Sequence, residues 1–383
     1  MTMTINNEHK KLNVPNLRFK EFQGEWEKCK LGDYGKVVTG NTPPTKDIEN
    51  YENGTYLWAS PADLGTIKSI TETKTMLSAQ GFSKTRTLPK GSVLVTCIGS
   101  TIGKAGMATK EMSTNQQINS IVVNDNNDNE FVYYAIQSAF PRYLSSIAVQ
   151  AVPIISKSAF EMLPNKRSCL QEQKKIGKFL SLLDERIATQ NKIIDDLQSL
   201  IKGISSRIFA SIQGIEYRMG DIASITNGDS NVQDAVTEPK DGLYPFFDRS
   251  EDIKYLSTYL FDKEAIIYPG EGAEFSPRYF KGKFALHQRC YAIFDFNEII
   301  NAQYLYFYLK TQNSYFVRNA VGSTVPSLRL DTFQKLKVVI PPKKIQYSVS
   351  LCLSSMEQKF NVENEILQML LKQKQYLLRQ MFI

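Results

Sequence analysis

The chain has 383 residues, of which 42% are hydrophobic and 11% aromatic, so it can form substantial cores, and its length predicts two or three domains. A net charge of +7 permits nucleic acid as a partner without requiring it. The five cysteines form no CxxC pair, which argues against a disulfide framework and a zinc ribbon. With two histidines, a histidine triad or a multi-histidine metal site is nearly excluded. No run approaches the roughly 18 apolar residues of a membrane span, and the first residues lack an apolar signal core, so we expect a cytoplasmic protein with no membrane partner.

The first block of the chain combines short β-type runs with turn signals. Residues 1–14 are polar and are expected to form a flexible tail, and Pro15–Trp26 is an aromatic lead-in. Runs such as KVVTG, TYLWAS, GSVLVTCIG and INSIVVN predict strands, and FVYYAIQSAFPRYLSS predicts an amphipathic helix with an aromatic face. We therefore predict a mixed α/β domain over 15–169.

A long helical segment is predicted over 170–213, with helical residues from about Leu170 to Ser211. Its apolar residues recur in steps that alternate between four and three, which is the pattern of a heptad seam. At 1.5 Å per residue such a helix is about 60 Å long. The SIQG segment (Ser211–Gly214) ends it.

The second block, over 214–343, repeats the first in the same order. The LGD sequence at Leu31 returns as MGD at Met219, and the aromatic helix returns as Gln303–Lys310. A second long helix closes the chain over 344–383, and Gln346–Ile383 aligns without a gap on Gln173–Ala210, with Lys374 as the one break in its seam. The chain is therefore internally duplicated.

The two long helices are expected to pair as an antiparallel coiled coil. One seam position is polar in both copies, as Gln190 and Glu363, and each lies at the middle of its repeat, where the pair could fix the register. A pseudo-two-fold molecule suits duplex DNA, the commonest partner with that symmetry. The predicted pairing residues are Ile176, Leu180, Leu183, Ile187, Gln190, Ile194, Leu197, Val349, Leu353, Met356, Phe360, Glu363, Leu367 and Leu370.

Three motifs suggest chemistry, and each also has a simpler interpretation. GSTIGKA (Gly99–Ala105) has three residues between its glycines where a phosphate loop has four, and an alanine follows Lys104. Asp63 followed by Glu72 and Lys74 is similar to a nuclease metal site, but the second block has no matching trio. NTPP at Asn41 lacks the aromatic residue and the glycine-rich turn of an amino-methyltransferase. Surface turns and loops are the favoured interpretation of all three.

As a set, the motifs resemble those of the specificity subunit of type I restriction-modification systems. The residues that carry the resemblance are LRFKEFQGEW, LGD…TGNTP, KGSVLVTCIGSTIGKAG, STNQQINSIVV and the EQKKIGKFLSLLD helix, followed by the second round. The resemblance implies an α/β (α+β) fold with two globular target-recognition domains, separated by two conserved helices that act as a spacer. It also implies that methylation and cleavage reside in other subunits. The second block departs from the pattern: TGNTP becomes NGDSN, and GSTIGK becomes GEGAEF, where Glu271 stands at a turn that would avoid an acid if it faced phosphate.

Candidate DNA contacts are predicted in the glycine turns and their internally aligned positions. Glutamine and asparagine suit adenine edges, arginine suits guanine, and threonine or serine serves either. The candidates in the first block are Thr39, Asn41, Thr42, Ser60, Ser100, Thr101, Lys104, Gln116 and Gln117. Those in the second block are Asn227, Asp229, Arg249, Ser250, Arg278, His287, Gln288 and Arg289.

The expected partners are double-stranded DNA, two modification (methyltransferase) subunits docked on the outer faces of the helices, and restriction (endonuclease and translocase) subunits where the system has them. No catalytic, metal or cofactor site is expected in this chain, whereas S-adenosylmethionine, ATP and Mg²⁺ are expected in the partner subunits. Two alternatives stay open: a single-chain restriction or methylation enzyme, and a coiled-coil scaffold that binds only proteins.

Overall fold

The structure, a computed structural model, describes residues 13–65, 67–146, 154–322 and 324–383. Residues 1–12, which hold most of the predicted tail and His9, lie outside these ranges. The chain divides into two compact units. The first unit contains the described residues up to Asn191 together with Ile366–Ile383, and the second unit contains Lys192–Glu365.

The first unit is built on three small sheets. One pairs β1 (Glu27–Lys30) with β10 (Pro164–Arg167) in antiparallel fashion. The five-stranded sheet has the order β2 (Gly35–Thr39), β9 (Ile118–Val123), β6 (Val93–Thr96), β7 (Ala105–Ala108) and β4 (Ser69–Ile70). The third has the order β5 (Thr75–Leu77), β3 (Tyr56–Ala59) and β8 (Ser113–Thr114).

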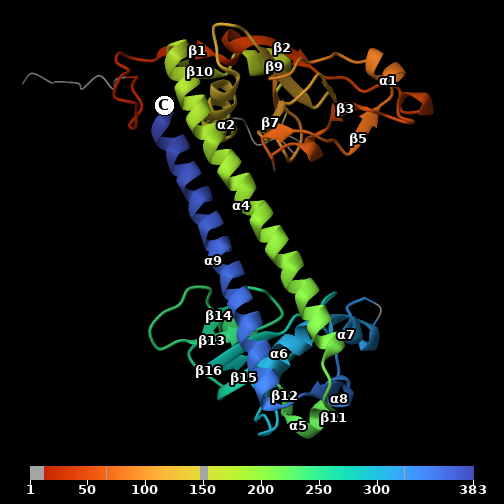
Figure 1. The fold of residues 1–383 in the computed structure, drawn as a ribbon. Helices are drawn as coiled ribbons and strands as arrows, with labels where there is room; N and C mark the ends of the chain where they lie inside the picture. Colours follow the sequence, from red (N-terminus) through yellow and green to blue (C-terminus); the bar gives the residue numbers. More distant parts are fainter. Residues whose placement is uncertain (1–12, 66, 147–153, 323) are drawn as a thin grey trace, which may run out of the picture. The chain divides into compact units, whose positions relative to one another are not determined.

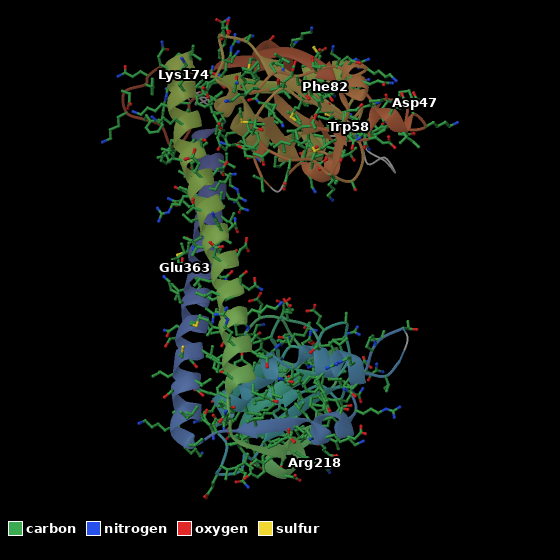
Figure 2. All side chains as sticks on the ribbon, turned by 45° about the vertical axis from the view of Figure 1, so that its right-hand side comes forward. Asp47, Trp58, Phe82, Lys174, Arg218 and Glu363 are labelled. Atoms are coloured by element: carbon green, nitrogen blue, oxygen red, sulfur yellow. The ribbon has the colours of Figure 1, made fainter. Side chains whose placement is uncertain are left out.

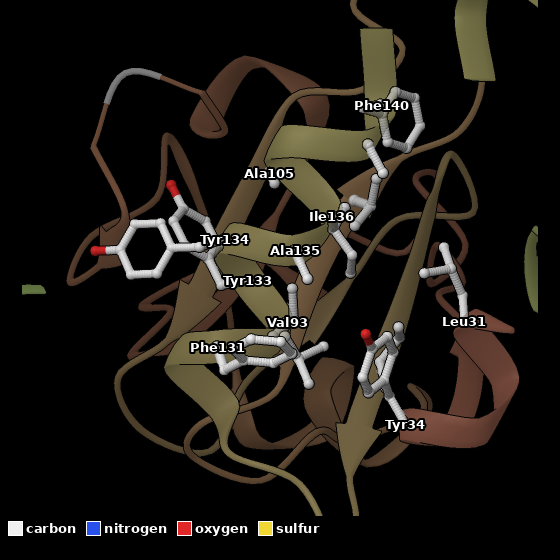
Figure 3. Close-up of a cluster of buried hydrophobic side chains, with 14 of the residues drawn as sticks. Leu31, Tyr34, Val93, Ala105, Phe131, Tyr133, Tyr134, Ala135, Ile136 and Phe140 are labelled. Carbon is white, nitrogen blue, oxygen red and sulfur yellow. The ribbon is translucent and has the colours of Figure 1, made fainter. Parts of the chain in front are cut away.

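The helices of the first unit cover these sheets. The short ones are η1 (Leu31–Tyr34), η2 (Ile48–Asn50), η3 (Pro61–Asp63), α1 (Ala79–Ser83) and α3 (Lys157–Glu161). The aromatic helix predicted before the first long helix is α2 (Asn129–Ser146). Its buried side chains, among them Phe131 and Ile136, pack with Val93 of β6 and Tyr34 (Figure 3). Burial of these large apolar side chains is the main stabilising term of the unit.

The second unit has one larger sheet and one ladder. The sheet has the order β12 (Ser224–Asn227), β17 (Cys290–Phe294), β15 (Phe261–Pro269), β16 (Arg278–Leu286), β13 (Tyr244–Phe247) and β14 (Lys254–Leu256). The ladder pairs β11 (Ile215–Arg218) with β18 (Lys337–Ile340). The helices are α5 (Met219–Ile222), η4 (Val232–Asp234), α6 (Ala302–Lys310), α7 (Asn313–Asn319) and α8 (Leu330–Lys335).

The two long helices are α4 (Leu170–Ser211) and α9 (Lys343–Met381), and each contributes one part to each unit (Figure 1). In the first unit, Ile176 and Leu180 of α4 share a core with Leu377 and Met381 of α9. In the second unit, the end of α4 packs on the start of α9, around Leu353. Because opposite ends meet in the two units, the helices run antiparallel, which confirms the predicted fold class.

The predicted pairing residues are all buried or half-buried, whereas the positions between them are mostly exposed. Gln190 and Glu363 are both buried, and Lys359 forms an ion pair with Glu363 within α9. That Gln190 and Glu363 meet, and the residue-by-residue pairing of the seam, stay predictions.

The duplication extends to equivalent ladders and equivalent glutamines. The β1–β10 ladder of the first unit corresponds to the β11–β18 ladder of the second. Gln173, near the start of α4, accepts a hydrogen bond from the backbone of Asp128 (3.0 Å) and donates one to the carbonyl oxygen of Ser168 (2.8 Å). Each unit thus ties its globular part to its long helix through a buried amide, since Gln346 occupies the same position on α9.

Candidate nucleic-acid interface

In the first unit, three loops meet at one end of the five-stranded sheet. The backbone of Asn41, just after β2, donates to the carbonyl oxygen of Thr114 (2.9 Å). The backbone of Cys97, just after β6, donates to the carbonyl oxygen of Gln117 (2.8 Å). The approach is close because Gly40 has no side chain: a Cβ there would lie 2.2 Å from the carbonyl oxygen of Thr114. Residues 39–42, 97–104 and 114–117 therefore form one continuous edge.

Several predicted contact residues of this edge are fixed by other protein groups. Thr39 donates to Asn119 (2.7 Å), and Thr42 donates to Gln116. The Asn41 amide donates to the carbonyl oxygen of Lys84 (2.9 Å) and accepts from the backbone of Arg86 (2.9 Å). Asn41 therefore holds the edge in shape. Figure 2 shows Trp58, whose indole donates to the Asn41 carbonyl oxygen (3.1 Å), close to Phe82 in the same unit.

The glycine turn between β6 and β7 presents the other predicted side chains. Gly99 and Gly103 have φ angles of 93° and 90°, which favour glycine. The backbone N–H of Gly103 donates to the carbonyl oxygen of Thr96 (2.9 Å), so a backbone hydrogen bond joins the end of the turn to β6. Ser100, Lys104 and Gln116 are exposed, and Thr101 and Gln117 are half-buried. This edge therefore offers a hydroxyl, an amide and a cation to a ligand.

Ser60 belongs to a capping arrangement beside this edge. Its hydroxyl and its backbone N–H both donate to Oδ2 of Asp63, at 2.7 and 2.8 Å. The other carboxylate oxygen accepts from the backbone of Lys74 (2.8 Å). Asp63, Glu72 and Lys74 line a pocket of about 420 Å³, but the carboxylate of Asp63 is engaged in holding the local backbone. Within the described residues, no three His, Cys, Asp or Glu side chains lie close enough together to hold a metal ion.

In the second unit, the loop after β12 lies against the turn between β16 and β17. The backbone of Ser230 donates to the carbonyl oxygen of Leu286 (3.1 Å), and the Asn227 amide donates to the carbonyl oxygen of Gln288 (3.1 Å). Gly228 permits this contact, since a Cβ there would lie 2.0 Å from the carbonyl oxygen of Leu286. Asn227, Asp229 and Gln288 are exposed on this edge.

The loop after β13 joins the same edge. The backbone of His287 donates to the carbonyl oxygen of Phe247 (2.9 Å), which places the following residues beside the 287–289 turn. Asp248 organises this loop by accepting from the backbone of Ser250 (2.8 Å) and from Lys254 (2.6 Å). Burial pushes the pKa of Asp248 upward, but these hydrogen bonds outweigh it, and the net pKa lies below the usual value.

The arginines of this edge differ in their surroundings. Arg249 is exposed, whereas Arg278 is half-buried and donates to the carbonyl oxygen of Ser250. Arg289 is exposed and forms an ion pair with Glu271 (2.8 Å). Burial lowers the pKa of His287, whose Nδ1 accepts from the backbone of Arg289 (3.2 Å), so we expect a neutral imidazole at pH 7.

The structure thus brings the predicted residues of each unit to one edge, by strand pairings that no local pattern specifies. Sequence reasoning missed Arg86, whose guanidinium donates to the carbonyl oxygen of Thr39 (2.8 Å). It also missed Asn119 and Asp248 and identified no partner for Glu271. Arg86 lies in KTRT, a basic stretch without a glycine turn, and the candidates were predicted from glycine turns and internally aligned positions.

Comparison with known proteins identifies the family. The family model described as "Type I restriction modification DNA specificity domain" matches residues 23–199 and again 215–372. The chain is 23% identical to the type I restriction enzyme MjaIX specificity subunit of Methanocaldococcus jannaschii, over 90% of this chain and 89% of that protein. The HindI specificity subunit of Haemophilus influenzae is 29% identical over 46% of this chain and 40% of its own length.

Solved structures share the fold. The S subunit of a type I restriction-modification system from M. genitalium matches with a TM-score of 0.67 at 18% identity, covering 97% of this chain and 99% of that one. Among the residues that the structure describes, no helix has the length and apolar character needed to cross a membrane. The two matches to the family model cover most of the chain, which therefore belongs to the type I restriction-modification DNA specificity family as a sequence-specific DNA-recognition subunit that is not itself catalytic.

Proposed function

We propose that the strand-end edge of each unit reads one half of a bipartite DNA site. The observation that carries this is the convergence, in both units, of loops bearing amide, hydroxyl and cationic side chains onto one edge of a sheet. Base edges in the major groove are read by these side-chain types. We assign the two target-recognition domains to 15–169 and 214–343, and the helical spacer to 170–213 and 344–383, with 1–14 as a tail.

Exposure separates two groups among the proposed contact residues. Ser100, Lys104, Gln116, Gln288 and Arg289 are exposed and are proposed to contact DNA directly. Half-buried residues whose side chains bind the protein, such as Asn41 and Ser60, are proposed to shape the edge. Phosphate contacts by the cationic members would make affinity fall steeply with salt.

The outer faces of the long helices are the proposed docking surface for two modification subunits. They carry apolar side chains that remain exposed, including Leu182 and Leu200 on α4 and Leu351 and Met369 on α9. Exposed apolar side chains can contribute to a protein interface, and the internal duplication provides one such helix in each repeat. We infer that S-adenosylmethionine, ATP and Mg²⁺ bind to the partner subunits, that restriction subunits join the complex where present, and that the assembly works in the cytoplasm.

The test is a methylome read by long-read sequencing. The chain is co-expressed with its cognate modification subunit in a host that lacks DNA methylation, and the modification subunit alone serves as the control. We expect a new split motif with a fixed gap and a methylated adenine on each strand.

Other outcomes favour the alternatives. A continuous motif would contradict the two-reader assignment. No methylation with an active partner would favour the protein-binding scaffold, and methylation or cleavage by the purified chain alone would favour a single-chain enzyme.

A further inference from the structure

Glu271, one of the acidic residues at the edge of the second unit, is the least expected feature of that surface. Glu271 follows β15 in a loop whose backbone is held by a neighbouring segment: Gly272 donates to the carbonyl oxygen of Pro326 (3.0 Å), and Leu328 donates to that of Gly270 (2.8 Å). The side chain of Glu271 is only 17% exposed. A carboxylate fixed beside a DNA-reading edge would repel phosphate unless it had a cationic partner or a specific task.

That partner is Arg289, in the turn between β16 and β17. Nη1 of Arg289 lies 2.8 and 3.1 Å from the two carboxylate oxygens of Glu271. The turn itself is fixed, since Gly270 donates to the carbonyl oxygen of Arg289 (2.9 Å) and Cys290 donates to that of His287 (2.9 Å). The Arg289 side chain is nevertheless 62% exposed. The ion pair therefore holds one end of an otherwise accessible guanidinium.

This arrangement leaves one donor edge of the guanidinium outside the ion pair. Arginine carries donors on Nε, Nη1 and Nη2 in a rigid plane, and the contacts to Glu271 are made through Nη1. Nε and Nη2 form the parallel fork that matches the O6 and N7 acceptors of guanine. An arginine already held by a carboxylate loses less conformational entropy when it binds a base.

We propose that Arg289 is the guanine-reading residue of the second unit and that Glu271 is its positioning residue. This inference rests on the proposed function, and it specifies one base of the half-site read by the second unit. The buried end of the pair, Glu271, sets the direction of the fork, and the exposed end, Arg289, makes the base contact. Phosphate binding by Arg289 is the competing role, and it would confer affinity without base preference.

The experiment measures methylomes for the intact chain and its variants, each co-expressed with the modification subunit. The variants are Arg289→Gln, Arg289→Lys and Glu271→Gln. The matched control is Asp295→Asn, which breaks the exposed ion pair with Lys263 at the opposite end of the same strands. Melting temperatures of the purified variants confirm that each is folded.

We expect the unsubstituted chain to require guanine at one position of one half-site. Arg289→Gln and Arg289→Lys should reduce the preference for guanine at that position by roughly 10- to 100-fold, because neither side chain offers the fork. Glu271→Gln should reduce it by a smaller factor, and Asp295→Asn should leave the motif unchanged. The other half-site should stay the same in every variant.

Three outcomes would overturn the inference while leaving the proposed function intact. These are an unchanged motif in Arg289→Gln, a motif retained in Arg289→Lys, and a uniform loss of methylation without any change in base preference. The last two would assign Arg289 to phosphate. An absence of any split motif in the unsubstituted chain would instead overturn the proposed function itself.

Discussion

In each unit, two contacts attach the globular part to a long helix. One contact is the same in both units, and the other is arranged differently. The shared attachment is the buried glutamine. Gln346 accepts from the backbone of Asn301 (2.7 Å) and donates to the carbonyl oxygen of Pro341 (2.9 Å). Gln173 makes the equivalent bonds in the first unit, with the equivalent backbone groups. Because these partners are backbone atoms, the bonds do not depend on the side chains that surround them.

The second attachment, an acid on the long helix paired with a tyrosine, is arranged differently in the two units. In the first unit, Tyr134 of α2 donates to Asp184 of α4 (2.6 Å), and the cation is Lys374 of α9 (2.6 Å). Burial raises the pKa of Tyr134, so its hydroxyl remains a donor. The tyrosine, the acid and the cation come from three different helices.

In the second unit, the acid is Glu357 of α9, which is equivalent to Asp184. Tyr306 donates to it (2.9 Å), and the cation is Lys310, from the same helix as Tyr306. The position equivalent to Lys374 is Ile201, which stays in the apolar seam. Backbone-directed contacts therefore persist between the repeats, whereas the cation that balances the acid comes from a different element in each unit.

The largest expected effect comes from removing the shared attachment. Gln173→Leu or Gln346→Leu leaves a buried backbone donor and acceptor unsatisfied, so each should lower the free energy of unfolding by about 2–4 kcal/mol. Urea unfolding of the purified chain measures this, with the exposed Gln171→Leu as the control. Unequal losses at Gln173 and Gln346 would show that the attachments are not equivalent.

An intermediate effect is expected at the break in the seam. Lys374→Ile makes the first unit resemble the second, but it leaves Asp184 without its cation, and the side chains are 20% and 13% exposed. We expect a loss of about 1–3 kcal/mol in the free energy of unfolding, smaller than for a fully buried pair. Adding Asp184→Asn should recover most of it. If Lys374→Ile leaves the free energy of unfolding unchanged, the ion pair does not explain why the heptad seam is interrupted at this position.

The smallest effect concerns pH and should be confined to the second unit. Burial lowers the pKa of His287, and Arg289 and Arg249 lower it further, while Asp248 and Glu271 oppose them. Since the folded pKa lies below the unfolded value of about 6.5, the neutral imidazole contributes stability that is present above that value. This contribution is lost as the pH falls through the folded pKa.

NMR titration of the His287 ring proton, in a His9→Gln background, checks that prediction. We expect a titration midpoint below about 6.5. The melting temperature of the unsubstituted chain should fall between about pH 7.5 and 5.5, and that of His287→Gln should fall less. A midpoint above that of a free histidine would contradict the environment described for this edge.

Local pattern was sufficient for the two long helices and the two aromatic helices of this fold. The heptad repeat predicted helical residues from about Leu170 to Ser211, and α4 has these bounds. The aromatic segment Gln303–Lys310 is α6 with one further residue. Such elements are specified by side-chain periodicity within one stretch of chain.

Contacts between segments that are distant in the sequence could not be predicted from side-chain periodicity. The parallel pairing of Trp58 with Ser113 brings Ser60 beside the proposed reading edge, and no periodicity encodes this pairing. Lys374 looked like a defect in the seam because its partner, Asp184, is 190 positions earlier in the sequence. The charge of Glu271 was likewise interpretable only once Arg289 was known to lie beside it.

The paired ladders have a consequence for how new specificities arise. Glu27 of β1 lies opposite Arg167 of β10, and Ile215 of β11 lies opposite Ile340 of β18, so the ends of each globular block are hydrogen-bonded neighbours. Ladder bonds join backbone groups and tolerate many side chains. Recombination between two genes at the codons for such a ladder would therefore exchange one globular block, with its proposed reading surface, as a unit. The recombinant protein would keep its long helices, and with them the proposed subunit contacts, unchanged.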